Sequence, residues 1–321
     1  MQTWLSPRGE RSPGVVVGTM NFGKRTPEDE ARKIVDRAFD RDVPIFDTAN
    51  AYNDGESERI LGRALRGRRD KARVATKCGI GKLSGPLEGL TAPVVRGECD
   101  ASLKRLGIER IDLYYLHRPD PKTPFDETLG AIHDLLRQGK IANWGVSNFA
   151  SWQILEMNGI CERASMPIPA VSQLIYNLLV RQLDVEYFAF ARKHPIHTTV
   201  FNPLAGGLLA GKGLRKDIEP GSRFDKNPLY QKRYLSDRFF ELAEAYGKLA
   251  REAGMSLVEL AYRFVVSQPG VDSVLLGPAT VEQLDAGIDA CARPLPQELG
   301  ARIDELHRAY LGTDAVYARV T

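Results

Sequence analysis

Residues 43–77 read VPIFDTANAYNDGESERILGRALRGRRDKARVATK and contain one complete unit of the fold. The two ends of this stretch, VPIFD and RVATK, are short apolar runs that stop at Asp47 and Lys77, which is typical of buried strands. Between them, the segment from Glu56 to Arg66 is predicted to be a helix. A strand, a helix and a second strand in this order indicate two parallel strands joined by a crossover helix.

The same alternation extends in both directions from this unit. Toward the N-terminus, VVVGT (15–19) precedes a helical stripe formed by Ala31, Ile34, Val35, Ala38 and Phe39. Toward the C-terminus, further strands are predicted from IDLYYLH (111–117), ANWGVSN (142–148), AVSQL (170–174), HTTVFN (197–202) and SVLLG (273–277). Helices are predicted between them near residues 93–106, 125–138, 150–160 and 184–193, and after the last strand near 281–290.

Eight apolar strands, each followed by a helix, predict an α/β protein whose parallel sheet is covered on both faces. Eight such units in 321 residues fit a closed (β/α)8 TIM barrel better than a doubly wound sheet. A Rossmann fold would also place GxGxxG after its first strand, and GTMNFGKR (18–25) lacks that spacing. The longest connection, residues 203–272, joins the seventh and eighth strands and is predicted to hold two helices. Because no linker interrupts the chain, we expect a single domain over residues 1–321.

Composition and residue spacing indicate which partners and which cellular compartment to expect for this chain. The 44 Lys and Arg against 41 Asp and Glu leave a net charge of +3, too small to predict a nucleic-acid or membrane-surface partner. The N-terminal segment does not read as a signal peptide, and no run approaches the roughly 20 apolar residues of a membrane-spanning helix. We therefore expect a cytoplasmic protein. The four cysteines lack Cys-x-x-Cys spacing and the five histidines lack a pair such as HExxH, so no metal site is expected.

Polar side chains gather where the predicted strands end. Asp47, Lys77 and His117 close the second, third and fourth strands, and Tyr52 follows in the DTANAY turn. Active sites of such barrels lie at this face, so these side chains are expected to converge on one pocket. A lysine cation lowers the pKa of a nearby tyrosine, an aspartate keeps the lysine charged, and a neutral imidazole orients a carbonyl oxygen. The set can protonate a carbonyl oxygen but lacks an electron source, which a nicotinamide hydride would supply. The sequence therefore predicts carbonyl reduction.

The chain resembles an aldo-keto reductase along essentially its whole length. The resemblance rests on DTANAYNDGESERILGRAL (47–65), VATK (74–77), GIERIDLYYLHRPD (107–120), GKIANWGVSNF (139–149) and VFNPLAGGLLAGK (200–212). It implies that Tyr52 is the general acid, that Lys77 and Asp47 tune it, and that His117 orients the carbonyl. It also implies that NADPH is bound in extended form without a Rossmann fold.

The resemblance implies the cofactor contacts as well. Ser147, Asn148 and Gln173 would hydrogen-bond the nicotinamide amide, and Phe201 would stack on its ring, at a position often filled by Tyr. The other implied contacts are Thr19 and Asp47, then Asn202, Pro203, Leu204 and Gly206 along the diphosphate, and Gly277, Ala279, Thr280 and Gln283 at the adenosine 2′-phosphate. The family often has Arg or Lys in this last segment and Asn at the position of Gly287. Both are missing here, so Lys212 and Arg223 could supply the positive charge.

Within the family, the chain is most similar to the aflatoxin-aldehyde and succinic-semialdehyde reductase branch, on SNFASW (147–152), QLIYNLLVRQ (173–182), GSRF (221–224) and YQKRY (230–234). That branch holds a substrate carboxylate with arginines, which here would be Arg233 and Arg319. The alternative is that both are solvated surface arginines. The other implied substrate contacts are Met20, Tyr52 and His117. The expected substrate is a small carbonyl compound, an anionic or aromatic aldehyde, and the dimers in this branch favour a homodimer.

Two other functions stay open at this point. The chain could be a cofactor-binding regulatory subunit with little turnover, like the family's potassium-channel β-subunits, because such subunits can keep the same four residues. It could also be a lyase or aldolase that uses Lys77 as a Schiff base, although a neighbouring Asp47 would keep that lysine protonated. Trapping with borohydride and substrate distinguishes this last function from a reductase.

Overall fold

The computed structural model describes residues 3–8, 14–81, 88–211, 218 and 220–312. Within these ranges, eight parallel strands close into a barrel in chain order, and β8 pairs with β1. The strands are β1 (Gly14–Gly18), β2 (Ile45–Asp47), β3 (Arg73–Cys78), β4 (Leu113–Leu116), β5 (Trp144–Ser147), β6 (Val171–Ile175), β7 (His197–Phe201) and β8 (Ser273–Leu276). The predicted (β/α)8 TIM barrel is therefore confirmed.

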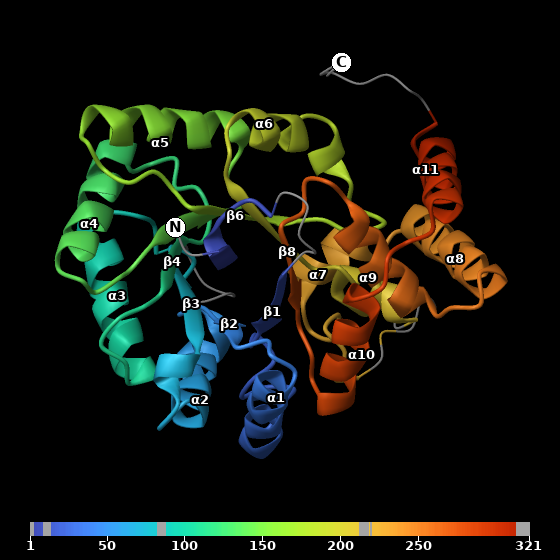
Figure 1. The fold of residues 1–321 in the computed structure, drawn as a ribbon, viewed down its shortest axis with the longest axis horizontal. Coiled ribbons are helices and arrows are strands. Elements are labelled where there is room, and N and C mark those ends of the chain that lie inside the picture. The colour runs from blue at the N-terminus through green and yellow to red at the C-terminus, as the bar shows by residue number, and fades with distance from the viewer. Residues whose placement is uncertain (1–2, 9–13, 82–87, 212–217, 219, 313–321) are drawn as a thin grey trace.

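Helices surround the strands (Figure 1). They are α1 (Glu28–Asp40), α2 (Glu56–Ala64), α3 (Ala92–Leu106), α4 (Phe125–Arg137), α5 (Ser151–Arg163), α6 (Tyr187–Lys193), α7 (Pro228–Tyr234), α8 (Asp237–Glu252), α9 (Leu257–Ser267), α10 (Val281–Cys291) and α11 (Gln297–Leu311). Short 3-10 helices add η1 (Thr3–Leu5), η2 (Tyr52–Gly55), η3 (Arg69–Lys71), η4 (Gln182–Asp184) and η5 (Ala205–Ala210). The stripe predicted for α1 is its inner face: Ala31, Ile34, Val35 and Ala38 are buried.

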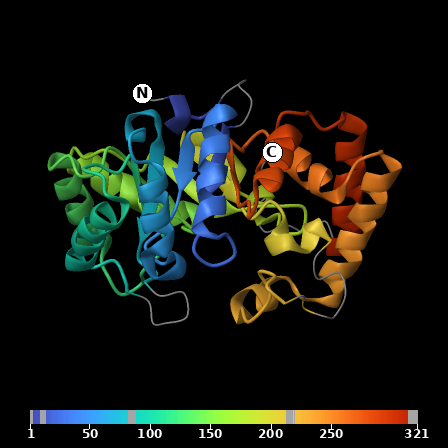
Figure 2. The same cartoon turned by 90° about the horizontal axis from the view of Figure 1, so that it is seen from below.

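The structure corrects the prediction in three places. The connection between β7 and β8 holds three α-helices in its described part instead of two, because a short α7 precedes α8 and α9. Asn227 caps α7, and Pro228 occupies its first turn, where a backbone N–H has no helical partner. The helix expected from residue 184 begins at Tyr187, after η4. The helix α11 is not predicted; it buries Leu299 and Ile303 and lies beside α8 in Figures 1 and 2.

The two ends of the barrel are covered differently. In Figure 2, η1 lies at one end and α7 at the other. Leu5 of η1 is buried at the first end against Ala75, Leu113 and Val171, with Trp4 packed beside it. The amino-terminal end of the barrel is thus closed by apolar side chains. The carboxyl ends of the strands lie at the other end, together with η5 and α7 of the β7–β8 connection. This end is where a binding or active site is expected in such a barrel.

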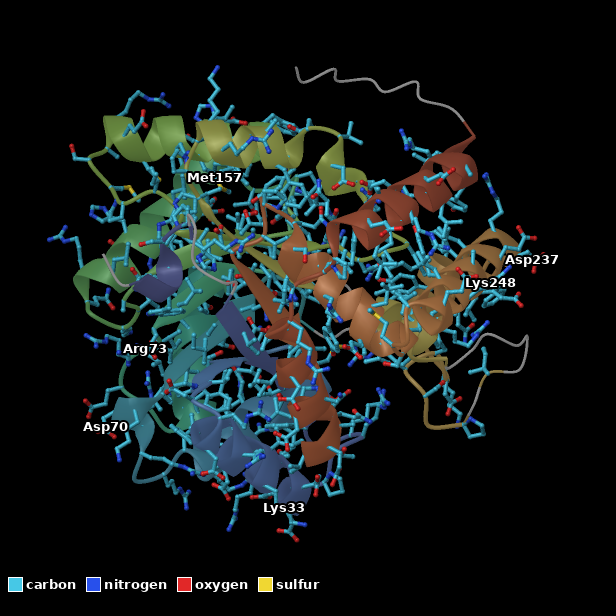
Figure 3. The ribbon with its side chains drawn as sticks, turned by 45° about the vertical axis from the view of Figure 1, so that its right-hand side comes forward. Lys33, Asp70, Arg73, Met157, Asp237 and Lys248 are labelled. Atoms are coloured by element: carbon cyan, nitrogen blue, oxygen red, sulfur yellow. The ribbon has the colours of Figure 1, made fainter. Side chains whose placement is uncertain are left out.

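Charged side chains lie on the outer faces of α1 and α8. Figure 3 shows Lys33 on α1 and Asp237 and Lys248 on α8 at the surface of the molecule. Met157 of α5, in contrast, is fully buried. Among the described helices, none has both the length and the apolar character that crossing a bilayer requires.

Candidate active site

A cavity of about 550 Å³ opens at the carboxyl ends of the strands, a size common for ligand pockets. The predicted site residues that line it are Met20, Asp47, Tyr52, His117, Ser147, Asn148, Gln173, Phe201, Asn202, Pro203, Leu204, Gly206, Arg223, Arg233, Gly277 and Gln283. The structure therefore brings most of the predicted site together in one space. Two further predicted residues, Lys212 and Arg319, lie outside the described residues.

Lys77 lies beneath this cavity with no exposed surface. β3 places it beside β2, and its ammonium group forms an ion pair with Asp47 at the end of that strand. Lys77 Nζ also donates to the Thr48 carbonyl oxygen at 2.8 Å and to the Tyr52 hydroxyl at 3.5 Å. One ammonium group therefore contacts both the carboxylate and the phenol of the predicted catalytic set.

The turn after β2 carries Tyr52 to the cavity. Asn53 and Asp54 follow it with φ angles of 53°, a left-handed conformation that Asn and Asp adopt more readily than most residues. Asn53 Nδ2 donates to the carbonyl oxygens of Met20 at 3.1 Å and Phe22 at 2.7 Å. These bonds fasten the turn to the β1–α1 connection, so the position of the phenol depends on the side chain next to it.

Burial and charge act in opposite directions on Tyr52. Burial raises the pKa of its phenol above the ordinary value, and the neighbouring Lys77 cation offsets only part of that rise. For Lys77, burial alone would lower the pKa of the ammonium, but Asp47 and Tyr52 raise it above its usual range. The pKa of Tyr52 is therefore raised overall, which corrects the expectation of a lowered pKa. At neutral pH the site holds a protonated phenol beside a charged ammonium, which is the state a proton donor needs.

His117 follows β4, and its ring meets the Tyr52 ring edge to face, with centroids 5.9 Å apart. Its backbone N–H donates to the Cys78 carbonyl oxygen at 2.8 Å. Burial, together with the Lys77 and Arg118 cations, holds the pKa of the imidazole well below its usual range, so the ring is neutral. Its buried Nδ1 finds no hydrogen-bond partner in the described part of the chain. A neutral imidazole beside the phenol can donate one N–H to an oxygen atom in the cavity.

Amide and hydroxyl groups form the part of the wall predicted to hold a nicotinamide. Asn148 Nδ2 donates at 3.0 Å to both the His117 carbonyl oxygen and the Ser147 hydroxyl. Gln173 Nε2 donates to Asp47 Oδ2 at 2.8 Å. This bond ties the amide wall to the carboxylate that pairs with the buried lysine, so the two predicted groups of residues form one hydrogen-bonded unit.

β7 ends at Phe201, whose partly exposed ring lines the cavity, and leads into η5. There, Gly206 has a φ of 72° and Gly207 a φ of 112°, backbone angles that residues with a Cβ rarely adopt. A Cβ on Gly206 would also lie 2.8 Å from Tyr230 Cδ1. The loop therefore needs glycine for its backbone and for its close approach to Tyr230. The Phe201 ring, the Asn148 and Gln173 amides and the loop around Gly206 lie along one cavity. Their chemistry fits the nicotinamide ring, the carboxamide and the diphosphate of a nicotinamide dinucleotide.

Thr19, Ala279 and Thr280 do not line the cavity. The Thr19 hydroxyl donates to the Asp47 carbonyl oxygen at 3.2 Å, and the Thr280 side chain caps α10. The Ala279 N–H donates to the Gln283 side chain at 2.8 Å. These three residues thus support the frame of the site, and their cofactor contacts stay predictions.

Several lining residues were not predicted from the sequence, among them Arg25, Ile80, Tyr230, Tyr262 and Glu282. They lie on connections and helices, where no strand-end pattern marks them. For Tyr230 a signal existed, because it begins the YQKRY segment. Arg25 carries no such signal, since only the course of the β1–α1 connection brings it to the cavity.

The absence of Asn at position 287 has a packing explanation. A Cβ on Gly287 would lie 2.9 Å from Leu276 Cδ1 and 3.6 Å from Tyr262 Cε2. α10 therefore packs so closely on β8 that a larger residue would displace Leu276. Any contact that an Asn makes at this position in other proteins must come from elsewhere in this chain.

Comparisons with known proteins agree with this geometry. The model of the Aldo/keto reductase family matches residues 14–308. Aldo-keto reductase family 7 member A3 of Homo sapiens is 34% identical over 318 residues, covering 93% of this chain and 94% of that protein. Aflatoxin B1 aldehyde reductase member 2 of Mus musculus is 34% identical over 298 residues (87% and 80%). A probable voltage-gated potassium channel subunit beta of Arabidopsis thaliana is 32% identical over 277 residues (84% of each).

Proposed function

Because this chain belongs to the aldo/keto reductase family, it is an oxidoreductase that acts on aldehydes or ketones, and we propose that it reduces them to alcohols with NADPH. The observation that carries the proposal is the contact of one buried ammonium, Lys77, with both Asp47 and Tyr52 beside a neutral His117. NADPH would supply the hydride that adds to the carbonyl carbon.

Each residue of this set then has its own task. The His117 N–H binds the carbonyl oxygen and holds it near the Tyr52 hydroxyl. Tyr52 gives its proton to that oxygen as negative charge develops there. Lys77 stabilises the phenolate that remains, and Asp47 keeps Lys77 charged and in place.

The cavity wall offers groups for the nicotinamide and the diphosphate of NADPH. Ser147, Asn148 and Gln173 would bind the carboxamide of the nicotinamide through their hydroxyl and amide groups. Phe201 would stack on the ring, and the loop around Gly206 would bring backbone N–H groups close to the diphosphate. All five residues line the cavity, which supports this assignment.

We propose an anionic or aromatic aldehyde as the substrate. Arg233 lines the cavity with its guanidinium carbon 5.6 Å from the centroid of the Tyr230 ring. A guanidinium held in this way can bind a carboxylate through two parallel hydrogen bonds. Met20 would add an apolar contact, and Arg319 is proposed as a second cation for the same carboxylate.

The geometry does not favour a Schiff-base enzyme. A Schiff-base lysine must lose its proton before it attacks a carbonyl. Here the ion pair with Asp47 raises the pKa of Lys77. Borohydride added with substrate should therefore leave Lys77 unmodified, and a covalent adduct on Lys77 would instead support a lyase or aldolase.

We further propose one domain over residues 1–321, a homodimer and a cytoplasmic location. Cys78, Cys99, Cys161 and Cys291 are free and buried, which suits a reducing compartment. Light scattering of the purified protein tests the homodimer directly, because a monomer mass would contradict it.

Oxidation of NADPH in the presence of succinic semialdehyde or nitrobenzaldehyde tests the proposed reaction, with NADH measured in parallel. We expect turnover with NADPH and a preference for the semialdehyde. Tight NADPH binding without turnover of either aldehyde would contradict the proposal and support a cofactor-binding regulatory subunit. No binding of either cofactor would contradict both functions.

A further inference from the structure

The side chain of Tyr115 lies inside the barrel, next to the ion pair of Lys77 and Asp47. Tyr115 belongs to β4 and is only 2% exposed. In the sheet its partners are Lys77 of β3 on one side and Gly145 of β5 on the other. Together with Asp47 it lines a small cavity of about 20 Å³ in the barrel interior. The reaction proposed above gives this large polar side chain no task.

The ring of Tyr115 faces the Lys77 ammonium from the β4 side. Lys77 Nζ lies 5.7 Å from the centroid of this ring and 5.1 Å from the centroid of the Tyr52 ring. A cation within about 6 Å of an aromatic face is attracted by the ring. The groups that accept hydrogen bonds from the ammonium are Asp47, Thr48 and Tyr52, in β2 and the turn after it. The Tyr115 ring therefore attracts the ammonium from a second direction.

The neighbouring strand β5 fixes the place of this ring. A Cβ on Gly145 would lie 3.0 Å from Tyr115 Cε1 and 3.1 Å from Tyr115 Cδ1. The ring thus packs directly on the backbone of β5, where a side chain would push it away. Its position beside the ammonium is set by packing and by the register of the sheet, since Tyr115 is paired with Lys77 and with Gly145.

The hydroxyl of Tyr115 is joined to the carboxylate of the same ion pair through one amide. It forms hydrogen bonds with the side chains of Gln173 and Thr199. Gln173 Nε2 in turn donates to Asp47 Oδ2 at 2.8 Å. Thr199 Oγ1 lies 2.8 Å from Ser273 Oγ, so the chain of polar contacts continues to β8. One side chain thus acts on both members of the ion pair, with its ring on the cation and its hydroxyl on the amide that binds the anion.

We propose that Tyr115 is a positioning residue for the ion pair of Lys77 and Asp47, an inference that rests on the proposed function. Tyr115 is not among the described residues that line the large cavity, so it acts on the reaction through this pair and not through the substrate. Its ring holds the ammonium near Tyr52. An ammonium displaced from Tyr52 would stabilise the phenolate less, because the attraction between two charges weakens with distance.

Two substitutions separate the ring from the hydroxyl. Tyr115→Phe removes only the hydroxyl, and Tyr115→Leu removes the ring as well. In single turnovers with bound NADPH, we expect the rate of aldehyde reduction to fall about three- to tenfold in Tyr115→Phe and about ten- to a hundredfold in Tyr115→Leu. KM for the aldehyde and Kd for NADPH should change by less than about twofold, because the lost interaction matters only in the transition state.

A double-mutant cycle with Lys77→Met tests whether Tyr115 acts through Lys77. Once the ammonium is gone, there is no cation left for the ring to hold. Adding Tyr115→Leu to Lys77→Met should therefore lower the rate by less than about a further twofold. General damage to the barrel would instead lower the rate by the same factor in both backgrounds.

Tyr114→Phe and Tyr114→Leu are the matched controls. Tyr114 precedes Tyr115 on β4, is fully buried, and donates its hydroxyl to the Val95 carbonyl oxygen of α3 at 3.3 Å. Its side chain points to the opposite face of the strand. These variants lose the same atoms as the Tyr115 variants and should lower the Tm, but their single-turnover rates should stay within about twofold of the wild type. Thermal unfolding verifies the fold of every variant, and Tyr115→Phe carries the comparison if Tyr115→Leu does not fold.

Three results would overturn the positioning role. Unchanged rates in both Tyr115 variants would show that the ion pair does not depend on this side chain. Equal losses with and without Lys77 would show that Tyr115 does not act through the ammonium. Weaker NADPH binding at an unchanged rate would limit its role to the Gln173 amide. In each case a wild type that reduces aldehydes leaves the proposed function intact, whereas a wild type without turnover would contradict that function and the inference with it.

Discussion

Lys77 Nζ lies 3.5 Å from the Tyr52 hydroxyl while the same ammonium is ion-paired with a buried carboxylate. A proton donor must hold its proton before the reaction and must be stable as an anion after it, and burial and the ammonium bear on these two requirements separately. The phenol is protonated at neutral pH and burial raises its pKa further, while the fixed ammonium can stabilise the phenolate once the proton has left. A phenol in water would have no cation fixed beside its conjugate base.

The Lys77→Met variant should move the pH dependence of reduction in a defined direction. Reduction needs protonated Tyr52, so kcat/KM is high below the pKa of the phenol and falls as pH rises through it. Lys77 lowers that pKa and Asp47 raises it. Removing the ammonium should therefore shift the alkaline limb of the pH profile, where kcat/KM falls, to higher pH. The rate on the plateau should fall by about 10²- to 10⁴-fold, since the phenolate loses its cation. A limb that stays in place or moves to lower pH would contradict this electrostatic account.

The Arg233→Ala variant should discriminate between substrates. We expect KM for succinic semialdehyde to rise about tenfold or more, because a charged hydrogen bond to the carboxylate is lost. KM for a neutral aldehyde such as nitrobenzaldehyde should change little. The adjacent Lys232→Ala variant removes an exposed cation that does not line the cavity, and it serves as the control. Equal effects of Arg233→Ala on both aldehydes would argue against a carboxylate contact.

The glycine loop after β7 offers a matched pair of substitutions. Gly206 and Gly211 both have left-handed φ angles, 72° and 79°, so an alanine at either position should cost about 1–2 kcal/mol of stability. Only at Gly206 would the new Cβ meet Tyr230, at 2.8 Å, whereas nothing lies within 4 Å at Gly211. We expect Gly206→Ala to lower the Tm further and to weaken NADPH binding, as measured by thermal unfolding and titration. Identical behaviour of the two variants would mean that the contact with Tyr230 does not shape the loop.

The fold was predictable from sequence because its signals are local. Each strand is a short apolar run that ends in a polar residue, and in a parallel barrel all such ends meet at one face. Asp47, Lys77 and His117 could therefore be placed together before any distance was known. The short helix α7 and the C-terminal α11 escaped prediction because their residues lie outside the repeating unit of strand and helix.

The part of the site that could not be predicted depends on loops. Arg25 reaches the cavity because Asn21 ties the β1–α1 connection to the carbonyl groups after β8, a contact between residues 256 and 257 positions apart. No periodic pattern encodes such a contact. The net direction of the Tyr52 pKa was also out of reach, since it depends on how completely the phenol is buried and not only on its neighbours.

The reduction rate of Tyr52→Phe, measured together with its NADPH affinity, tests the central claim most directly. The variant removes one oxygen atom, so the account predicts loss of aldehyde reduction by about 10²-fold or more while the Kd for NADPH stays nearly unchanged. Tyr310→Phe, which removes a hydroxyl from α11 outside the cavity lining, should retain full activity. Turnover by Tyr52→Phe at the wild-type rate would contradict the assignment of Tyr52 as the proton donor.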